Sequence, residues 1–151
     1  MQHNLAQSPF PFAFPIFLVA LGCTLPLFIA AMSGWSMLRR RFSQTFPFTG
    51  EAWKWQSARM RLGCNYNNCL TVGADASGLY LSVLFLIRIG HPPLFLPWQE
   101  IAVRRRSKGP LFRYVELHLG RDEQVPFMIR ERLAERLKSA AGPNWPPEPI
   151  G

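Results

Sequence analysis

The chain carries no charged side chain from Asn4 to Leu38, and three consecutive arginines, Arg39, Arg40 and Arg41, follow directly. The hydrocarbon core of a bilayer is about 30 Å thick, and roughly 20 apolar residues of helix cross it. The uncharged run is long enough to cross with some tilt. We therefore expect a transmembrane helix over residues 14–38.

Proline and aromatic residues within and beside this run affect the shape and the position of the expected helix, but they do not exclude it. Pro26 removes one backbone donor and is expected to kink the helix. In lipid the freed carbonyl needs a partner, which Thr24 or a local change of hydrogen-bond pattern can supply. Aromatic rings favour the membrane interface, so we expect Trp35 to lie at one boundary and Phe10, Phe12 and Phe14 to lie near the other.

Two other interpretations of the apolar run are less favoured. A secretory signal peptide begins with positive charge, whereas here the arginines follow the run; Ala31-x-Ser33 is its one plausible cleavage signal. A buried helix of a soluble protein rarely stays uncharged over this length. A membrane anchor is the better interpretation.

The arginines also predict the orientation. Cytoplasmic flanks carry an excess of Lys and Arg, and the segment before the run has neither. We expect a single-pass protein of the inner (cell) membrane, with residues 1–13 outside and the chain from Phe42 onward in the cytoplasm.

The length that remains after the anchor limits the number of folded domains. Of 151 residues, about 100 are left for one modest domain with its own core. We expect a basic stop and linker over 39–52, a cytoplasmic domain over 53–141, and a flexible proline-rich tail over 142–151.

The charge of the remaining chain is moderately basic. Without Arg39 to Arg41, 14 of the 17 basic side chains remain against 9 acidic ones, a balance of +5. Such a charge suits anionic lipid beside the anchor. Nucleic acid, the other polyanion, is a less favoured partner because the tether brings the lipid surface nearer.

The cysteines predict neither disulfides nor metal. Three cysteines, Cys23, Cys64 and Cys69, are an odd count in a domain placed in the cytoplasm. A zinc site would need His91 and His118 as further ligands, whereas structural zinc normally uses compact ligand pairs. We expect no metal and no cofactor.

Short strand-like runs separated by turn residues follow the anchor. The strongest, Leu79 to Ile89, is apolar on nearly every position of one face and on much of the other, and it predicts a central strand. Leu94 to Val103 resumes extended structure, and Pro97 places it at a sheet edge or at a bulge. Phe112 to Leu119 alternates between apolar and polar residues. Weaker runs precede and follow these, at 53–62, 69–72 and 125–128.

One helical pattern closes the domain. Ile129, Leu133 and Leu137 recur at spacings of four, and Gly142-Pro143 ends the pattern, which predicts an amphipathic helix from Ile129 to Ala141. The expected fold class is α+β: one transmembrane helix, then a small antiparallel β-barrel or sandwich closed by a C-terminal amphipathic helix.

Two motifs add a resemblance. Gly78-Leu79-Tyr80-Leu81, a long apolar strand and then Leu96-Pro97-Trp98-Gln99-Glu100-Ile101 resemble the pleckstrin-homology-like superfold in its bacterial and GRAM-type forms, over about Ser57 to Ala141. The H-P-P-L-x-x-P-W-x-E-I pattern that starts at His91 is also similar to one found in small single-span bacterial membrane proteins. The resemblance implies a binding or assembly module and a closing helix, and it supplies no functional residue.

The residues themselves agree with a non-enzymatic module, because the chain contains no Gly-rich phosphate loop and no nucleophile elbow. Four cations within five residues form a basic turn. We expect it to face the inner leaflet or an acidic protein partner, the alternative being a solvated loop. The candidate contact residues are Arg39, Arg40, Arg41, Arg104, Arg105, Arg106, Lys108 and Arg113.

Two further functions stay open. The edge strand around Pro97 and Trp98 is a candidate surface for assembly into a membrane complex, with a protein partner or a second copy of the chain. His118 and Glu116, two apart on one strand face, are a remote candidate pair for a membrane-bound hydrolase. A solvated outer face is the favoured interpretation of that pair, and His91 is interpreted as a turn residue.

Overall fold

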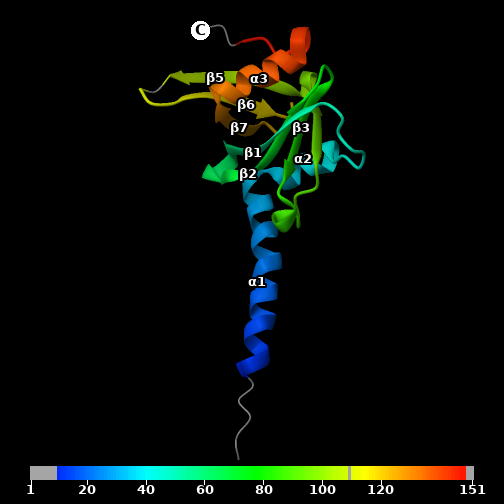
Figure 1. Ribbon diagram of the computed structural model, residues 1–151, viewed down its shortest axis with the longest axis vertical. Coiled ribbons are helices and arrows are strands. Elements are labelled where there is room, and N and C mark those ends of the chain that lie inside the picture. Colours follow the sequence, from blue (N-terminus) through cyan, green and yellow to red (C-terminus); the bar gives the residue numbers. More distant parts are fainter. Residues whose placement is uncertain (1–9, 109, 149–151) are drawn as a thin grey trace, which may run out of the picture.

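A computed structural model describes residues 10–108 and 110–148 of the chain. Helix α1, Phe10–Ser33, stands as a rod that projects from one end of a compact domain (Figure 1). Its segment Phe12–Ser33 has a mean hydropathy of 2.3 and is only 6% buried, so by length and composition it can cross a membrane.

The hydrogen bonding around Pro26 differs from the expected pattern. The Thr24 hydroxyl donates to the carbonyl of Ala20 at 2.9 Å, four residues before it. It therefore does not serve the carbonyl of Gly22, which is the one that Pro26 leaves without an N–H donor.

The helix expected over residues 14–38 is interrupted at Gly34. This glycine has a φ of +85°, and α2, Trp35–Phe42, starts immediately after it. Trp35 is fully buried, and its indole Nε1 donates to the carbonyl of Pro92 at 3.0 Å, so its expected place at the membrane interface is wrong. Leu38 and Phe42 are buried with it. The arginines that were expected in a linker thus lie on a helix that packs against the domain.

Seven antiparallel strands form one curled sheet, a half-barrel, in the order β4-β3-β2-β1-β7-β6-β5. Short 3-10 turns interrupt the connections. The predicted α+β class, with an apolar N-terminal helix and a closing C-terminal helix, is confirmed. The strands are β1 Glu51–Arg59, β2 Asn65–Ala74, β3 Gly78–Val83, β4 Leu94–Pro97, β5 Ile101–Lys108, β6 Arg113–Leu119 and β7 Val125–Arg130, and the 3-10 turns are η1 Arg61–Gly63, η2 Phe85–Ile87, η3 Trp98–Glu100 and η4 Gly142–Asn144.

The core lies on the concave face of this sheet. Along β6 and β7 the paired residues that point inward are fully buried: Val115 with Ile129, Leu117 with Phe127, and Leu119 with Val125. Helix α3, Glu131–Ala141, closes the sheet with Leu133, Ala134 and Leu137. The helix starts two residues later than predicted, because Ile129 belongs to β7.

The strongest predicted strand is shorter than expected. β3 stops at Val83, and the rest of the Leu79–Ile89 run forms η2 and the turn after it. Phe85 and Leu86 are 71% and 67% exposed. A run that is apolar on both faces fits a buried strand, but it does not indicate where the strand ends.

The first strands and the tail also differ from expectation. β2 is longer than the predicted 69–72, and β1 contains bulges near Gln56. Trp145 lies 5.5 Å from Trp98, centroid to centroid, and Glu148 accepts from Arg106 at 2.6 Å, so residues 142–148 pack on the domain instead of forming a flexible tail. Residues 149–151, and 1–9 of the expected outer segment, lie outside the described residues.

Candidate functional site

Three buried polar side chains meet where α1 enters the domain. The hydroxyl of Tyr66, on β2, lies 2.9 Å from Ser33 Oγ and 2.8 Å from His91 Nε2. His91 Nδ1 lies 3.2 Å from the carbonyl of Ile89. Ser33 and His91 are 0% and 1% exposed, so the cluster is closed to solvent. It joins the last turn of α1, the sheet and the segment after η2.

The proton positions in this cluster follow from its acceptors. The Ile89 carbonyl can only accept, so His91 Nδ1 carries the proton and Nε2 accepts from the Tyr66 hydroxyl. Burial lowers the pKa of His91 and raises the pKa of Tyr66 to about 12. Both groups are therefore neutral near pH 7, and the cluster is a structural joint.

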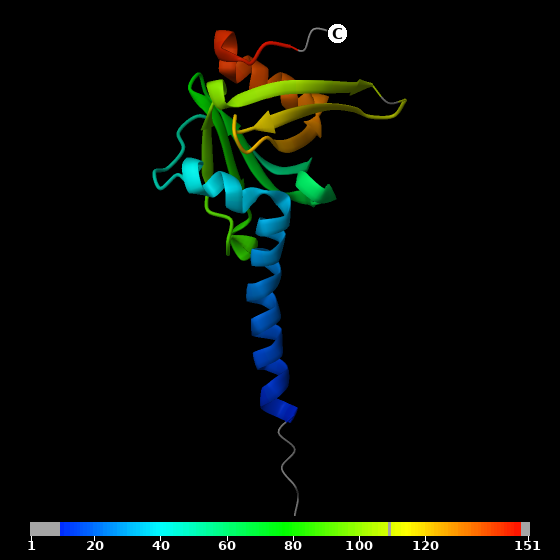
Figure 2. The same cartoon turned by 180° about the vertical axis from the view of Figure 1, so that it is seen from behind.

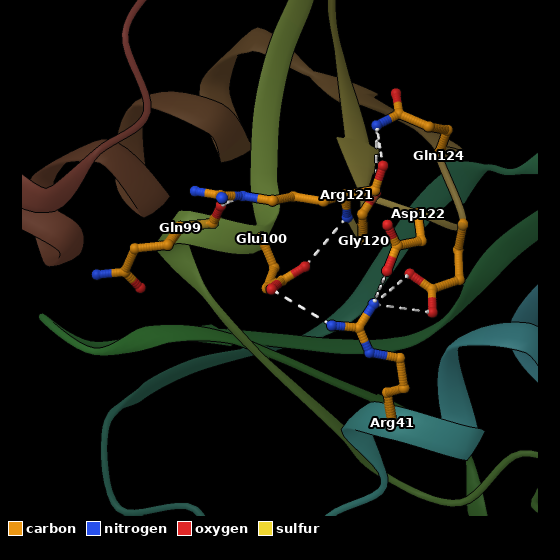
Figure 3. Close-up of polar contacts among 8 residues, drawn as sticks. Arg41, Gln99, Glu100, Gly120, Arg121, Asp122 and Gln124 are labelled. Carbon is orange, nitrogen blue, oxygen red and sulfur yellow. Dashed lines mark hydrogen bonds and ion pairs between the residues drawn. The ribbon is translucent and has the colours of Figure 1, made fainter.

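Arg41 is held by the domain. Its guanidinium lies 2.7 Å from Asp122, 3.4 Å from Glu123 and 3.5 Å from Glu100 (Figure 3). These acids come from the turn between β6 and β7 and from η3. Glu100 also accepts the backbone N–H of Arg121 at 3.1 Å, which ties the two turns together. This arrangement fixes the outer end of α2 on the domain.

The three consecutive arginines therefore do not act as one group. Arg39 and Arg40 are exposed and form no ion pair within the described part of the chain, whereas Arg41 points to the acidic turns. Arg41 is exposed as well, at 42% of its side chain, but its charge is already compensated by the acidic side chains, so Arg39 and Arg40 are the two whose charge the described residues leave unpaired for lipid headgroups.

The cations of the predicted basic turn also differ from one another, because some are paired within the protein and others are exposed. Arg106 pairs with Glu131, Glu135 and Glu148, and the hydrogen bond from Arg106 holds the pKa of Glu148 below its usual range. The other cations of the turn have different environments: Arg104 donates to Gln124 at 3.1 Å, Arg113 lies 3.6 Å from Glu131, Arg105 is exposed, and the Lys108 side chain lies outside the described residues.

The position of this turn bears on its expected contact with lipid. In both views the β5–β6 hairpin projects sideways near α3, at the end of the domain away from α1 (Figures 1 and 2). A bilayer crossed by α1 would lie at the opposite end. The contact of this turn with the inner leaflet stays a prediction, and the geometry gives it no support.

The strand that ends at Pro97 does lie at a sheet edge, but Trp98 is not exposed there, and the role of this edge in assembly stays a prediction. β4 is an edge of the sheet, with Pro97 at its end. Trp98 is only 2% exposed, and its indole N–H donates to the carbonyl of Asp75 at 2.8 Å. Trp98 is thus a core residue and cannot contact a partner without leaving the core.

His118 and Glu116 do lie together, on the outer face of β6. His118 Nε2 is 3.0 Å from Glu116 Oε1, and His118 Nδ1 is 3.1 Å from Gln124 Oε1. Each ring nitrogen already faces an oxygen acceptor, so neither is placed to take a proton from a water or a substrate. The hydrolase hypothesis stays untested and gains no reactive pair from this geometry.

The four predicted zinc-ligand candidates are dispersed. His91 is in the buried cluster and His118 is on the outer face, while Cys64 precedes β2 and Cys69 lies within it. Among the residues described, no three His, Cys, Asp or Glu side chains gather in a way that could hold a metal ion.

A polar groove on the outer face of the sheet was not predicted. It encloses about 330 Å³ where β1, β2, β6 and β7 run side by side. The outward positions of these strands alternate with the buried core, as in the pair Arg59 and Asn65. Two arginines and two amides make the groove rich in hydrogen-bond donors. Its lining includes Ser57, Arg59, Asn65, Asn67, Tyr114 and Arg130. The strand alternation of β6 was the one sequence signal for this face.

Comparison with known proteins adds no relative: no protein-family model matches the chain, and no curated protein is similar enough to count as a match.

Proposed function

We propose that this chain is a single-pass membrane-anchored binding or assembly module without enzymatic activity. One observation carries the proposal: α1 is long enough to cross a bilayer, and its apolar surface is left uncovered by the domain. An exposed apolar helix of this size is unfavourable in water and favourable in lipid.

The proposed orientation places the amino terminus outside and the domain in the cytoplasm, at the inner (cell) membrane. The support is the asymmetry of charge, with Arg39 and Arg40 exposed just beyond α1. Arg41 supports it less directly, since its charge is already compensated by acidic side chains of the domain.

The proposed fold family is pleckstrin-homology-like. The bent antiparallel sheet, the order of its strands and the closing helix α3 support this assignment. Fold alone does not define a function. A binding role agrees with the donor-rich groove, which suits an anionic or carbonyl-rich ligand.

The proposed partner is an acidic protein. Arg104 and Arg105 are exposed. They belong to β5, which lies at the end of the domain away from α1 (Figure 1). In a membrane-anchored chain these cations would face the cytoplasm, where an acidic protein can reach them and the bilayer cannot. Contact with anionic lipid would fall instead to Arg39 and Arg40.

Extraction and topology experiments test the anchor. The full-length protein is expected to stay in the membrane pellet at alkaline pH, which releases peripheral proteins. A fluorescent-protein reporter at the C-terminus should be active, and an alkaline phosphatase reporter at the same place should be inactive. Release into the supernatant would exclude a spanning helix, and the opposite reporter pattern would exclude the orientation.

A second candidate function is a structural subunit or assembly factor of a membrane complex. The position of β4 at the sheet edge favours it, because an edge strand has unpaired backbone groups. Part of this edge is covered, since Ser43 forms a bridge to Leu94. Cross-linking in native membranes from a cysteine at Phe95 tests this role, and recovery of monomer alone would count against it.

A further inference from the structure

The turn around η2 presents large apolar side chains to solvent. Phe85, Leu86 and Ile89 are 71%, 67% and 45% exposed, and we call these three residues the apolar tip. They lie next to one another at the end of a hairpin whose strands, β3 and β4, are buried in the core. A soluble domain rarely places such a group on a protruding turn unless something covers it.

The apolar tip lies beside α1. Gly90, which follows it directly, packs so closely on α1 that a Cβ there would come within 2.8 Å of the Leu27 side chain and 3.4 Å of that of Ala30. In both views the turn is the part of the domain that reaches furthest along α1, beyond α2 (Figures 1 and 2). The apolar tip and the exposed surface of α1 are therefore neighbours.

The length of α1 places a membrane boundary at this level. The roughly 20 residues from Phe10 to Ala30 make about 30 Å of helix, which matches the hydrocarbon thickness of a bilayer. The last turn of α1 is covered by the domain, since Ala30 is 2% and Ser33 is 0% exposed. The lipid-facing part of α1 thus ends where the apolar tip begins.

Charge supports the same boundary. Arg88 is exposed between the apolar residues of the turn. A long basic side chain can place its charge among headgroup phosphates while its neighbours enter the apolar layer. Apolar side chains with an adjacent cation are typical of segments that lie in the membrane interface.

We propose that the apolar tip inserts into the leaflet from which α1 emerges, so that the domain has a second contact with the bilayer. This rests on the proposed function, because it takes α1 to be a spanning helix. The occupant of the apolar surface is lipid, and the contact fixes the tilt of the domain relative to the membrane plane.

Spin labels at three positions of the full-length protein test the insertion. In a chain with Cys23, Cys64 and Cys69 changed to serine, single cysteines replace Leu18 in α1, Leu86 in the apolar tip and Leu111 in the β5–β6 loop. Leu111 is the matched control, since it is also a leucine and is 83% exposed, but it lies at the far end of the domain. Each label is compared for its accessibility to oxygen, which concentrates in lipid, and to a nickel chelate, which stays in water.

Insertion predicts an oxygen-to-nickel ratio several-fold higher at residues 18 and 86 than at residue 111, in vesicles of phosphatidylcholine and phosphatidylglycerol. A high ratio at 18 with an aqueous label at 86 would overturn the insertion and leave the anchor intact. A label at 86 that neither reagent reaches would indicate a protein contact and would also overturn it. An aqueous label at 18 would overturn the anchor and the insertion together.

A second measurement needs no substitution. The native chain in vesicles is exposed to a photoactivatable phosphatidylcholine whose reactive group lies near the headgroup end of the acyl chain. Adducts on residues 85–89 support the insertion, whereas adducts confined to α1 contradict it.

Discussion

The phenol oxygen of Tyr66 lies 2.8 Å from Nε2 of His91, and this contact joins the sheet to the turn beside α1. Burial lowers the pKa of His91, so the folded state holds a neutral imidazole. An unfolded chain takes up a proton there as the pH falls below about 6.5. The free energy of unfolding is therefore expected to decrease from pH 7 to pH 5, by up to about 1.4 kcal/mol per pH unit.

Thermal unfolding in mild detergent, followed by circular dichroism across this pH range, measures the effect. His91→Gln should be less stable at pH 7 and should lose this part of the pH dependence. His118→Gln leaves the buried cluster intact and should retain it. If the stability of His91→Gln decreased with falling pH as steeply as that of the native chain, His91 would not be the source of the pH dependence.

Removal of the Tyr66 hydroxyl should destabilise the joint between α1 and the domain. Tyr66→Phe keeps the ring and leaves His91 Nε2 without its hydrogen-bond partner, while Ser33 Oγ keeps only its longer contacts of 3.4 Å to Ala30 and Trp35. Unsatisfied buried polar groups cost about 1–3 kcal/mol. The melting temperature should fall, whereas Tyr80→Phe, on the same sheet, should change it little; equal effects would contradict a specific role for the cluster.

Gly34 is expected to tolerate no side chain. Its φ of +85° disfavours other residues, and a Cβ would lie 2.9 Å from both methyl groups of Val125. Gly34→Ala should destabilise the protein by about 1–3 kcal/mol. Gly22→Ala is the matched control, because the space around Gly22 is open. The melting temperatures of Gly34→Ala and Gly22→Ala are compared. Similar values would mean that α1 and α2 can be connected through a different backbone conformation.

Loss of Arg41 should loosen α2 without unfolding the domain. Arg41→Gln removes the contacts to Glu100, Asp122 and Glu123. Amide hydrogen exchange in residues 35–42 should become faster, and high salt should reduce the difference from the native chain because it screens exposed ion pairs. Arg40→Gln, which removes an exposed arginine of the same helix, should leave exchange unchanged.

Trp145 is expected to stabilise the domain. Its ring packs on Trp98 beside the η3 turn. Trp145→Ala should lower the free energy of unfolding by about 1–3 kcal/mol, since the ring is only partly buried. Phe46→Ala, which removes a side chain that is 79% exposed, is the control. If both substitutions changed the free energy of unfolding equally little, the tail would be flexible, as the sequence predicts.

The alternation of polar and apolar residues made part of the sheet predictable from the sequence. β6 was recognisable because polar and apolar residues take turns from Arg113 to Leu119, so the pattern identifies both the strand and its buried face. α3 was recognisable for the same reason at helical spacing. The end of β3 was not predictable, because a run that is apolar on both faces shows no alternation from which the buried face or the last strand residue can be identified.

The site was harder to predict than the fold, since pairing depends on tertiary contacts. Arg41 shares its charge and neighbours with Arg39 and Arg40, and only the position of the acidic turns separates it from them. Trp35 and Trp98 likewise read as surface aromatics until the fold shows the carbonyls that accept from their indoles, on Pro92 and Asp75.

The break at Gly34 has a consequence for how the domain meets other molecules. α1 passes into α2 with a single residue between them, and α2 is bound to the domain along its length. A domain on a long flexible linker samples a volume set by the linker. Here that volume is almost zero, so the domain cannot reach out to a partner. In a membrane-anchored chain, every encounter then depends on lateral diffusion of the whole protein, or on a partner that comes to its fixed height above the bilayer.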